Sequence, residues 1–271
     1  MKIIFAKYIG FCSGVKRAIL IANKSLENDK KPINFLGSLV HNEKVIEKFK
    51  KEGVKFIKSP KEAKSGTLII QAHGFPPFSK KITVRDATCP LVKKVQLAAN
   101  SFYKQGFQVI IAGDKKHDEV KGIKGYTKNK ALIIEGKEEV KKLSKFKKIG
   151  LVAQTTQSAK TYKTILEALK KKAGQFKWLN TLCPEVISRQ KELDRILERC
   201  DGILVIGSRS SANTKRLAEK AERLKKKIFW INSLKELKKI NFQNISYLGV
   251  VSGTSAPDWE IKKIKKWLTV K

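Results

Sequence analysis

The sequence predicts an α/β fold of three similar modules with small parallel sheets, arranged with pseudo-threefold symmetry. Three observations predict it: a cysteine ahead of a helical pattern occurs three times, an apolar run ending in glycine follows each cysteine, and a second apolar run then leads into a polar loop. Strands that alternate with helices form parallel sheets with right-handed crossovers. The modules are expected at residues 13–88, 89–182 and 183–271, the last completed by an N-terminal strand within residues 1–12.

The first repeated element is a cysteine followed by a helix. Proline directly follows Cys89 and Cys183, and proline suits the first turn of a helix, where its missing N–H needs no partner. The three segments are residues 10–18, 87–95 and 181–189. Cys200 does not fit the repeat, because it lies late in a predicted helix, and we expect it to be structural.

The second element is a short apolar run that we expect to be a buried parallel strand. These runs cover residues 33–37, 109–113 and 204–207, and the intervals from cysteine to final glycine are 25, 24 and 24 residues. Polar residues then recur in register. His41, His117 and Ser211 lie four residues past each glycine, and Glu43, Glu119 and Asn213 lie six residues past it.

The third element is an apolar run that ends in a polar loop, at residues 68–74, 150–156 and 248–255. Ligands of parallel sheets bind outside the carboxyl ends of the strands. The loops expected there contain every histidine of the chain and a set of hydroxyl and amide side chains, and such donors suit phosphate oxygens. The set is His41, His73, His117, Thr155, Thr156, Ser211, Asn213 and Ser255.

Composition limits the class of protein. The chain has 271 residues, 41% of them apolar, and no apolar stretch approaches the roughly 20 residues that span a bilayer. The apolar run at residues 3–6 is too short for a signal peptide. We therefore expect a soluble, cytoplasmic protein without a membrane partner.

The formal net charge is +35, which raises the question of nucleic-acid binding or of steering an anionic partner. Lysine-rich stretches such as residues 141–148 and 262–267 alternate with apolar residues along the whole chain, with no separate basic tail. This distribution is typical of solvated helix surfaces. Lysine alone reads no base sequence, so no specific nucleic-acid partner is expected.

Three cysteines in equivalent positions indicate a metal centre. A structural zinc site usually has four ligands with close spacing, whereas a four-iron cluster held by three cysteines leaves one iron open to substrate. The alternative is that three buried cysteines share the repeat by descent alone. No Walker-type glycine loop and no Gly-x-Ser-x-Gly turn are found, which argues against ATP chemistry and a serine nucleophile.

An acid beside such a centre could deliver a proton to a leaving hydroxyl. Glu119 has the repeat register for this role, and its neighbour Asp118 is the second candidate. A solvated surface glutamate remains the alternative, since that is the commoner fate of a lone acid.

These residues resemble the 4-hydroxy-3-methylbut-2-enyl diphosphate reductase family, which catalyses the last step of the methylerythritol phosphate route to isoprenoids. The resemblance runs the full length of the chain, in order. The matching segments are residues 10–15, 40–42, 72–74, 86–92, 117–120, 154–156, Cys183 with 189–190, 207–214 and 255–258.

The resemblance implies a single [4Fe–4S] cluster on Cys12, Cys89 and Cys183, with the substrate hydroxyl on the open iron. It implies Glu119 as proton donor and electrons from a reduced ferredoxin or flavodoxin. The products would be isopentenyl and dimethylallyl diphosphates. The residues implied to hold the diphosphate are His41, His73, His117, Thr155, Ser211, Asn213 and Ser255.

The chain departs from the family pattern at Asp118, Ala212, Val186 and Ile187. None of these is a cluster ligand or the proton donor, so the departures concern substrate affinity more than reaction type. The competing hypothesis, from a different class, is a non-catalytic phosphate- or RNA-binding protein that uses its basic surface.

Overall fold

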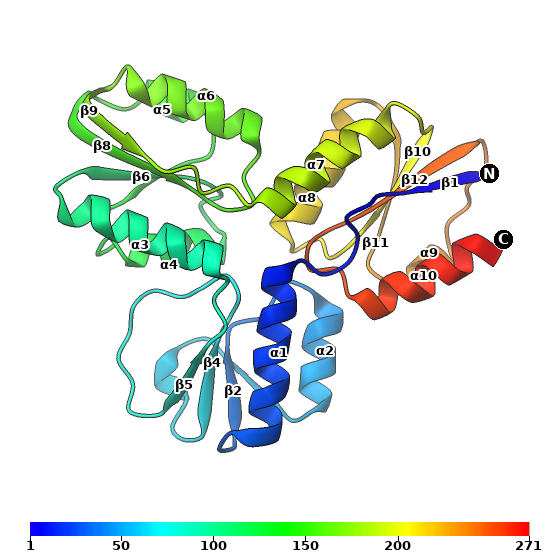
Figure 1. Ribbon diagram of the computed structural model, residues 1–271, viewed down its shortest axis with the longest axis horizontal. Helices are drawn as coiled ribbons and strands as arrows, with labels where there is room; N and C mark the ends of the chain where they lie inside the picture. The colour runs from blue at the N-terminus through cyan, green and yellow to red at the C-terminus, as the bar shows by residue number, and fades with distance from the viewer. Residues whose placement is uncertain (271) are drawn as a thin grey trace. The chain divides into compact units, whose positions relative to one another are not determined.

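The computed structural model describes residues 1–270, which form three four-stranded parallel sheets with intervening helices (Figure 1). The strand orders are β3-β2-β4-β5, β7-β6-β8-β9 and β11-β10-β12-β1. Each order follows the same plan, with the two strands of the repeated apolar runs in the centre. The predicted fold class is therefore confirmed.

The first sheet consists of short strands. They are β2 (Ile33–Leu36), β3 (Lys55–Ile57), β4 (Thr67–Ile70) and β5 (Thr83–Asp86). Helices α1 (Ser13–Asn28) and α2 (Glu43–Lys51) and the 3-10 turn η1 (Pro60–Glu62) accompany them in sequence. Leu36 and Leu68 of the central strands pack with Ile57 and Ala63 in its core, and Phe75, Phe78 and Ile82 cover this cluster.

The second sheet contains β6 (Gln108–Ala112), β7 (Leu132–Ile134), β8 (Phe146–Ala153) and β9 (Ala173–Trp178). Helices α3 (Pro90–Lys104) and α4 (Asp118–Gly125) pack on one face through a core that includes Val95, Val109 and Ile123. Helices α5 (Lys137–Lys141) and α6 (Ala159–Lys170) lie on the other face (Figure 1).

The third sheet contains β1 (Lys2–Phe5), β10 (Gly202–Ile206), β11 (Lys227–Ile231) and β12 (Tyr247–Ser252), and the N-terminal strand β1 pairs with β12. Helices α7 (Pro184–Leu197) and α8 (Ala212–Arg223) supply one core cluster against it. Helices α9 (Leu234–Leu237) and α10 (Asp258–Val270) supply another.

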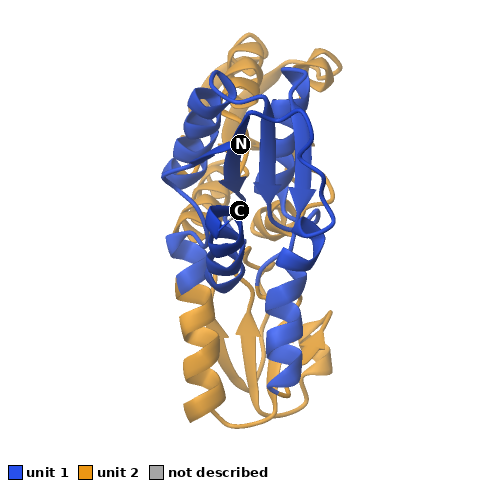
Figure 2. Cartoon of the chain, turned by 90° about the vertical axis from the view of Figure 1, so that its right-hand side faces the viewer, with its two compact units in different colours: residues 1–16, 40–52, 184–271 blue, residues 17–39, 53–183 orange. Residues whose placement is uncertain are grey.

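The described chain divides into two compact units, coloured in Figure 2. The first comprises residues 1–16, 40–52 and the described residues from 184 on, and contains the sheet of β1, β10, β11 and β12. The second comprises residues 17–39 and 53–183 and contains the other two sheets. The module boundaries expected from the sequence stay a prediction.

None of the helices in the described part of the chain is both long enough and apolar enough to cross a bilayer.

Candidate functional site

The three repeated cysteines share one backbone anchor. Each lies directly before a long helix, and each donates its N–H to a carbonyl of the loop that follows the last central strand of a sheet. The three hydrogen bonds run from Cys12 N to Thr254 O (3.0 Å), from Cys89 N to Ala72 O (2.9 Å) and from Cys183 N to Thr155 O (2.9 Å). Thiolates at helix N-termini are stabilised by free N–H groups and the helix dipole.

Exposure separates these three cysteines from the fourth. Cys12, Cys89 and Cys183 are half-buried, whereas Cys200 is 2% exposed and packs with Leu193 and Ile196 in the core beside β10. Burial, with the nearby charge of Asp201, raises the pKa of the Cys200 thiol. A thiol fully buried among apolar side chains is inert, as expected for a structural residue.

The Cys89 thiol is held in a mixed environment. Burial raises its pKa, the N–H groups of Leu91 and Val92 act in the opposite direction, and the charge of Glu119 raises it further. The Sγ of Cys12 likewise accepts a backbone N–H, from Val15 at 3.4 Å. Partly exposed thiols with N–H donors directed at sulfur have the chemistry that an iron–sulfur cluster requires of its ligands.

Glu119 is buried in the second unit, at 1% exposure. Its Oε1 accepts the N–H of Thr155 (2.6 Å) and its Oε2 accepts the Thr155 hydroxyl (2.9 Å). Because the carbonyl of Thr155 accepts the N–H of Cys183, a single residue connects the carboxylate to a repeated cysteine. Asp118 instead forms an ion pair with Lys121 at 3.3 Å on the outer side of α4.

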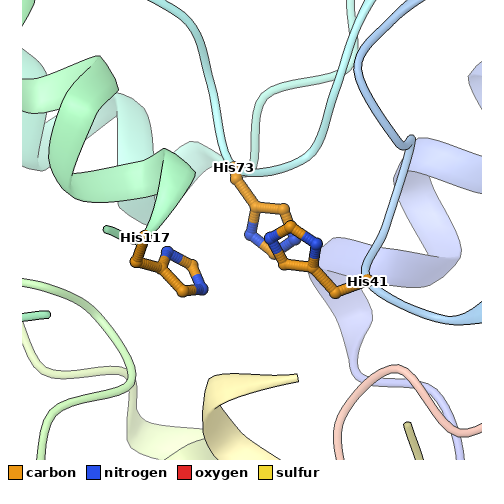
Figure 3. Close-up of side chains that lie close together, drawn as sticks. All are labelled: His41, His73 and His117. Carbon is orange, nitrogen blue, oxygen red and sulfur yellow. The ribbon is translucent and has the colours of Figure 1, made fainter. Parts of the chain in front are cut away.

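His117 caps helix α4, and its Nδ1 accepts the N–H of Glu119 at 3.2 Å. In the neutral imidazole the proton therefore lies on Nε2, which can donate to an anion. The rings of His117 and His73 meet edge to face, with centroids 5.4 Å apart (Figure 3). The second unit thus brings two of the three predicted histidines together.

The first unit contains a buried polar group at the start of α8. Ser211 caps the helix by accepting the N–H of Thr214. Asn213 is 1% exposed, and neither polar atom of its side chain has a hydrogen-bond partner among the described residues. An unpaired buried amide costs about 1–3 kcal/mol. A polar ligand bound beside Asn213 would satisfy this amide.

The loop that contains Ser255 is connected to the loop that contains His41. The Ser255 hydroxyl donates to the His41 carbonyl at 3.0 Å. Asn42, which is fully buried, caps α2 by accepting the N–H of Lys44 at 2.9 Å. These bonds fix the backbone of the histidine loop within the first unit.

The segment before Cys12 is held by three side chains. Ser252 Oγ accepts the N–H of Gly10 (2.8 Å), and the buried Arg189 donates to the Gly10 carbonyl (2.8 Å) and to Ser252. Asp258 accepts the N–H of Phe11 (2.9 Å). The sequence predicted no role at the site for these side chains, although residues 189–190 and 255–258 are among the segments that resemble the family.

Glu43 is a further residue for which the sequence predicted no role. Its carboxylate accepts hydrogen bonds from Ser208 Oγ (2.7 Å), Ser210 Oγ (3.3 Å) and Asn232 Nδ2 (2.7 Å). Asn42 also donates to Asn232 at 3.1 Å. The one indication in the sequence was that Glu43, like Glu119, lies six residues past the glycine that ends a repeated apolar run.

The predicted site residues fall into two groups, one in each compact unit. Cys12, His41, Ser211, Asn213 and Ser255 belong to the first. Cys89, Cys183, His73, His117, Glu119 and Thr155 belong to the second.

The fold and these groups define a class: an α/β protein of three repeated modules, with half-buried thiols at helix N-termini and polar loops suited to an anion. The family model described as "LytB protein" matches residues 3–269. The chain therefore belongs to the LytB family.

Curated relatives of this chain are named for one enzymatic activity. Proteins of Geobacter metallireducens (37% identical; 97% of this chain, 95% of the relative) and Dictyoglomus thermophilum (39% identical; 96% and 93%) are both named 4-hydroxy-3-methylbut-2-enyl diphosphate reductase. The family assignment that the sequence motifs predicted is confirmed, and it favours the reductase over the non-catalytic alternative.

Two solved structures that resemble this chain are described as the same kind of reductase. The E-1-hydroxy-2-methyl-but-2-enyl-4-diphosphate reductase of Plasmodium falciparum superposes with a TM-score of 0.91 at 31% identity, over 99% of this chain and 88% of that one. A second structure is described as (E)-4-hydroxy-3-methyl-but-2-enyl diphosphate reductase, the terminal enzyme of the non-mevalonate pathway. It has a TM-score of 0.72 at 33% identity over the full length of both chains.

Proposed function

We propose that this protein reduces (E)-4-hydroxy-3-methylbut-2-enyl diphosphate to isopentenyl and dimethylallyl diphosphates, in the cytoplasm. The observation that carries the proposal is the common anchor of Cys12, Cys89 and Cys183, each half-buried and each at a helix N-terminus. Membership of the LytB family supports the same substrate and reaction.

Cys12, Cys89 and Cys183 are proposed to bind one [4Fe–4S] cluster. When bound, such a cluster would supply the electrons for the reduction at this site. Soft sulfur donors favour such a cluster, and the half-buried positions of the thiols leave them accessible. The N–H groups beside Cys12 and Cys89 favour anionic sulfur, in opposition to the burial that raises the pKa of Cys89.

The diphosphate is proposed to bind to His41, His73, His117, Thr155, Ser211, Asn213 and Ser255. The Nε2–H of neutral His117 and the unpartnered amide of Asn213 are donors suited to phosphate oxygens. Helix N-termini add further N–H groups, since Ser211 begins α8 and His117 begins α4.

Glu119 is proposed to hold the proton that leaves with the substrate hydroxyl as water. Its carboxylate accepts the Thr155 hydroxyl proton at 2.9 Å. Once protonated, Glu119 can donate to that hydroxyl instead, and the hydroxyl is then able to pass its own proton to an acceptor. The reaction breaks one C–O bond and forms one C–H bond, and it consumes two electrons and two protons. A reduced ferredoxin or flavodoxin is proposed as the electron donor.

The test is turnover of the diphosphate by anaerobically purified protein with dithionite-reduced methyl viologen. Formation of the two five-carbon diphosphates, at a rate that requires the brown iron-containing form, is the expected result. Iron-loaded protein that forms neither product contradicts the proposal.

A further inference from the structure

The three repeated cysteine segments differ in the charge that follows the cysteine. Glu185 lies two residues after Cys183, in the first turn of α7, whereas the first turns of α1 and α3 contain no acidic residue. The residues at the equivalent position of the other two repeats are Gly14 and Leu91. The repeat therefore does not account for this carboxylate, and its own contacts have to explain it.

The contacts of Glu185 lead to a second cysteine segment. Its Oε1 accepts the N–H of Ser13 at 3.1 Å and also the Ser13 hydroxyl. Ser13 is the first residue of α1 and directly follows Cys12, and all three residues belong to the first compact unit. Glu185 therefore connects the start of α7 to the start of α1, at the residue next to a proposed cluster ligand.

The N-terminus of α1 thus serves two groups that can be anionic. The N–H of Ser13 is donated to the Glu185 carboxylate, and the N–H of Val15 is donated to the Sγ of Cys12. The free N–H groups of a first helical turn favour negative charge. Because the Ser13 nitrogen is bonded to the Cys12 carbonyl carbon, the carboxylate lies within about 10 Å of the Cys12 sulfur, a separation that salt of about 0.1 M screens only in part.

Arg17, about one turn further along α1, contacts the third cysteine segment. Its Nη1 donates to the Thr88 carbonyl at 3.0 Å, and Thr88 directly precedes Cys89. These residues belong to the second compact unit. Burial is the largest influence on the pKa of Cys89 and raises it, whereas the positive charge of Arg17 acts in the opposite direction. The guanidinium is therefore close enough to act on the Cys89 sulfur.

Helix α1 is consequently hydrogen-bonded to both other cysteine segments through side chains of opposite charge. These two bonds join one cysteine segment to another, whereas the backbone anchors join each cysteine to a loop. The reduction potential of an iron–sulfur cluster depends on the charges around it. A nearby carboxylate disfavours an added electron, and a nearby guanidinium favours it.

We propose that Arg17 and Glu185 are positioning residues for the proposed cluster, which hold α1 to the other two cysteine segments and set the electron affinity of the cluster by their opposite charges. The inference rests on the proposed function, because it assigns two residues a role toward the cluster of that reaction. Arg17 is exposed and Glu185 is partly exposed, so solvent and salt screen both charges and the effects should be moderate.

An anaerobic redox titration of the iron-loaded protein tests the role of the charges, with the midpoint potential of the cluster followed by its visible and electron paramagnetic resonance spectra. We expect the midpoint potential to rise in Glu185→Gln and to fall in Arg17→Gln, since one variant loses a negative charge and the other a positive charge. Both shifts should shrink as salt is raised. A purely structural role predicts no such opposition of sign.

The rate at which a chelator removes iron from the loaded protein tests the positioning role. Glu185→Ala and Arg17→Ala should each release iron about three- to tenfold faster than wild type, the equivalent of one lost hydrogen bond between cysteine segments. The thermal midpoint of the iron-free protein should fall no further in these variants than in the controls, because the bonds matter most when the thiols hold a cluster.

The matched controls are Glu192→Ala and Lys24→Ala. Glu192 lies seven residues beyond Glu185 on α7, and its carboxylate also accepts a backbone N–H, from Lys7 at 3.4 Å. Lys24 is an exposed cation seven residues beyond Arg17 on α1. Seven residues are about two helical turns, so both controls should keep the midpoint potential and the iron-release rate of wild type.

Three outcomes overturn the proposal: midpoint potentials that stay constant or move in the same direction in the two Gln variants, iron release at the wild-type rate in the two Ala variants, or equal effects in the controls. An Ala variant that cannot be loaded, while its iron-free form melts as wild type does, is the extreme form of the expected result. Wild-type protein that cannot be loaded with iron, or that is loaded and forms neither product, would instead contradict the proposed function.

Discussion

Glu119 and Asp118 are adjacent in sequence and lie in opposite surroundings. Glu119 is buried and accepts two hydrogen bonds from Thr155, while Asp118 is partly exposed and pairs with Lys121. The repeat register alone favours Glu119 as the proton donor. It could not predict the bond to Thr155, because that partner is 36 residues away in sequence.

Replacing Glu119 with Gln should lower kcat about a hundredfold or more, since a positioned acid contributes about that much and an amide cannot release a proton. The Gln oxygen can accept the Thr155 N–H while its NH2 group donates to the Thr155 hydroxyl oxygen, so iron content should match wild type. Turnover with methyl viologen and iron analysis are the measurements. Asp118→Asn is the control and should remain active; the reverse pattern would assign the proton to Asp118.

Asn213→Ala should separate stability from binding. The Asn213 amide is buried without a hydrogen-bond partner among the described residues, so its removal costs the protein no internal bond. The thermal midpoint should stay equal or rise, while the KM for the diphosphate rises about fivefold or more, the equivalent of one lost hydrogen bond. A lower midpoint with unchanged KM would make Asn213 a structural residue.

At the scale of elements, the buried central strands and the N-terminal edge strand β1 were predictable, whereas the other edge strands were not. Strands β2, β6 and β10 coincide with the apolar runs ahead of glycine, because buried parallel strands must be apolar on both faces. Strand β5 is exposed along its whole length, so its four residues form no apolar pattern. Strand β5 joins the sheet through its backbone pairing with β4, which its side-chain pattern does not indicate.

The connection between loops was equally hidden from sequence. Glu43 contacts Ser208 and Asn232, residues 165 and 189 positions away, and so ties the start of α2 to the loops after β10 and β11. The loop after β10 leads into α8, where Ser211 and Asn213 lie. The side chain of Glu43 is therefore a positioning group for proposed substrate-binding residues.

Glu43→Ala should raise the KM for the diphosphate by about three- to tenfold, since it removes hydrogen bonds worth about 1 kcal/mol in total at an exposed carboxylate. The kcat and the visible spectrum of the cluster should be unchanged. Glu47→Ala is the control, because Glu47 lies on the same helix and pairs with the neighbouring Lys44, at 3.1 Å. Equal KM values in the two variants would remove the positioning role.

On the scale of the whole molecule, the threefold repeat explains why cysteines 77 and 94 residues apart occupy equivalent positions in the fold. In each repeat an edge strand leads to a cysteine: β1 to Cys12, β5 to Cys89 and β9 to Cys183. In each, the same backbone hydrogen bond holds that cysteine to the neighbouring loop. Sequence spacing predicted the equivalence of the cysteines, but the shared anchor is a backbone contact that leaves no trace in residue identity.

Iron content of cysteine variants, purified without oxygen, tests the proposed cluster most directly. Wild type and Cys200→Ser should each contain about four irons per chain, while Cys12→Ser, Cys89→Ser and Cys183→Ser should each lose the cluster and its brown colour. Iron-free wild-type protein that cannot be reconstituted, or a full iron complement in any of the three repeated-cysteine variants, would contradict the assignment of the cluster to these thiols.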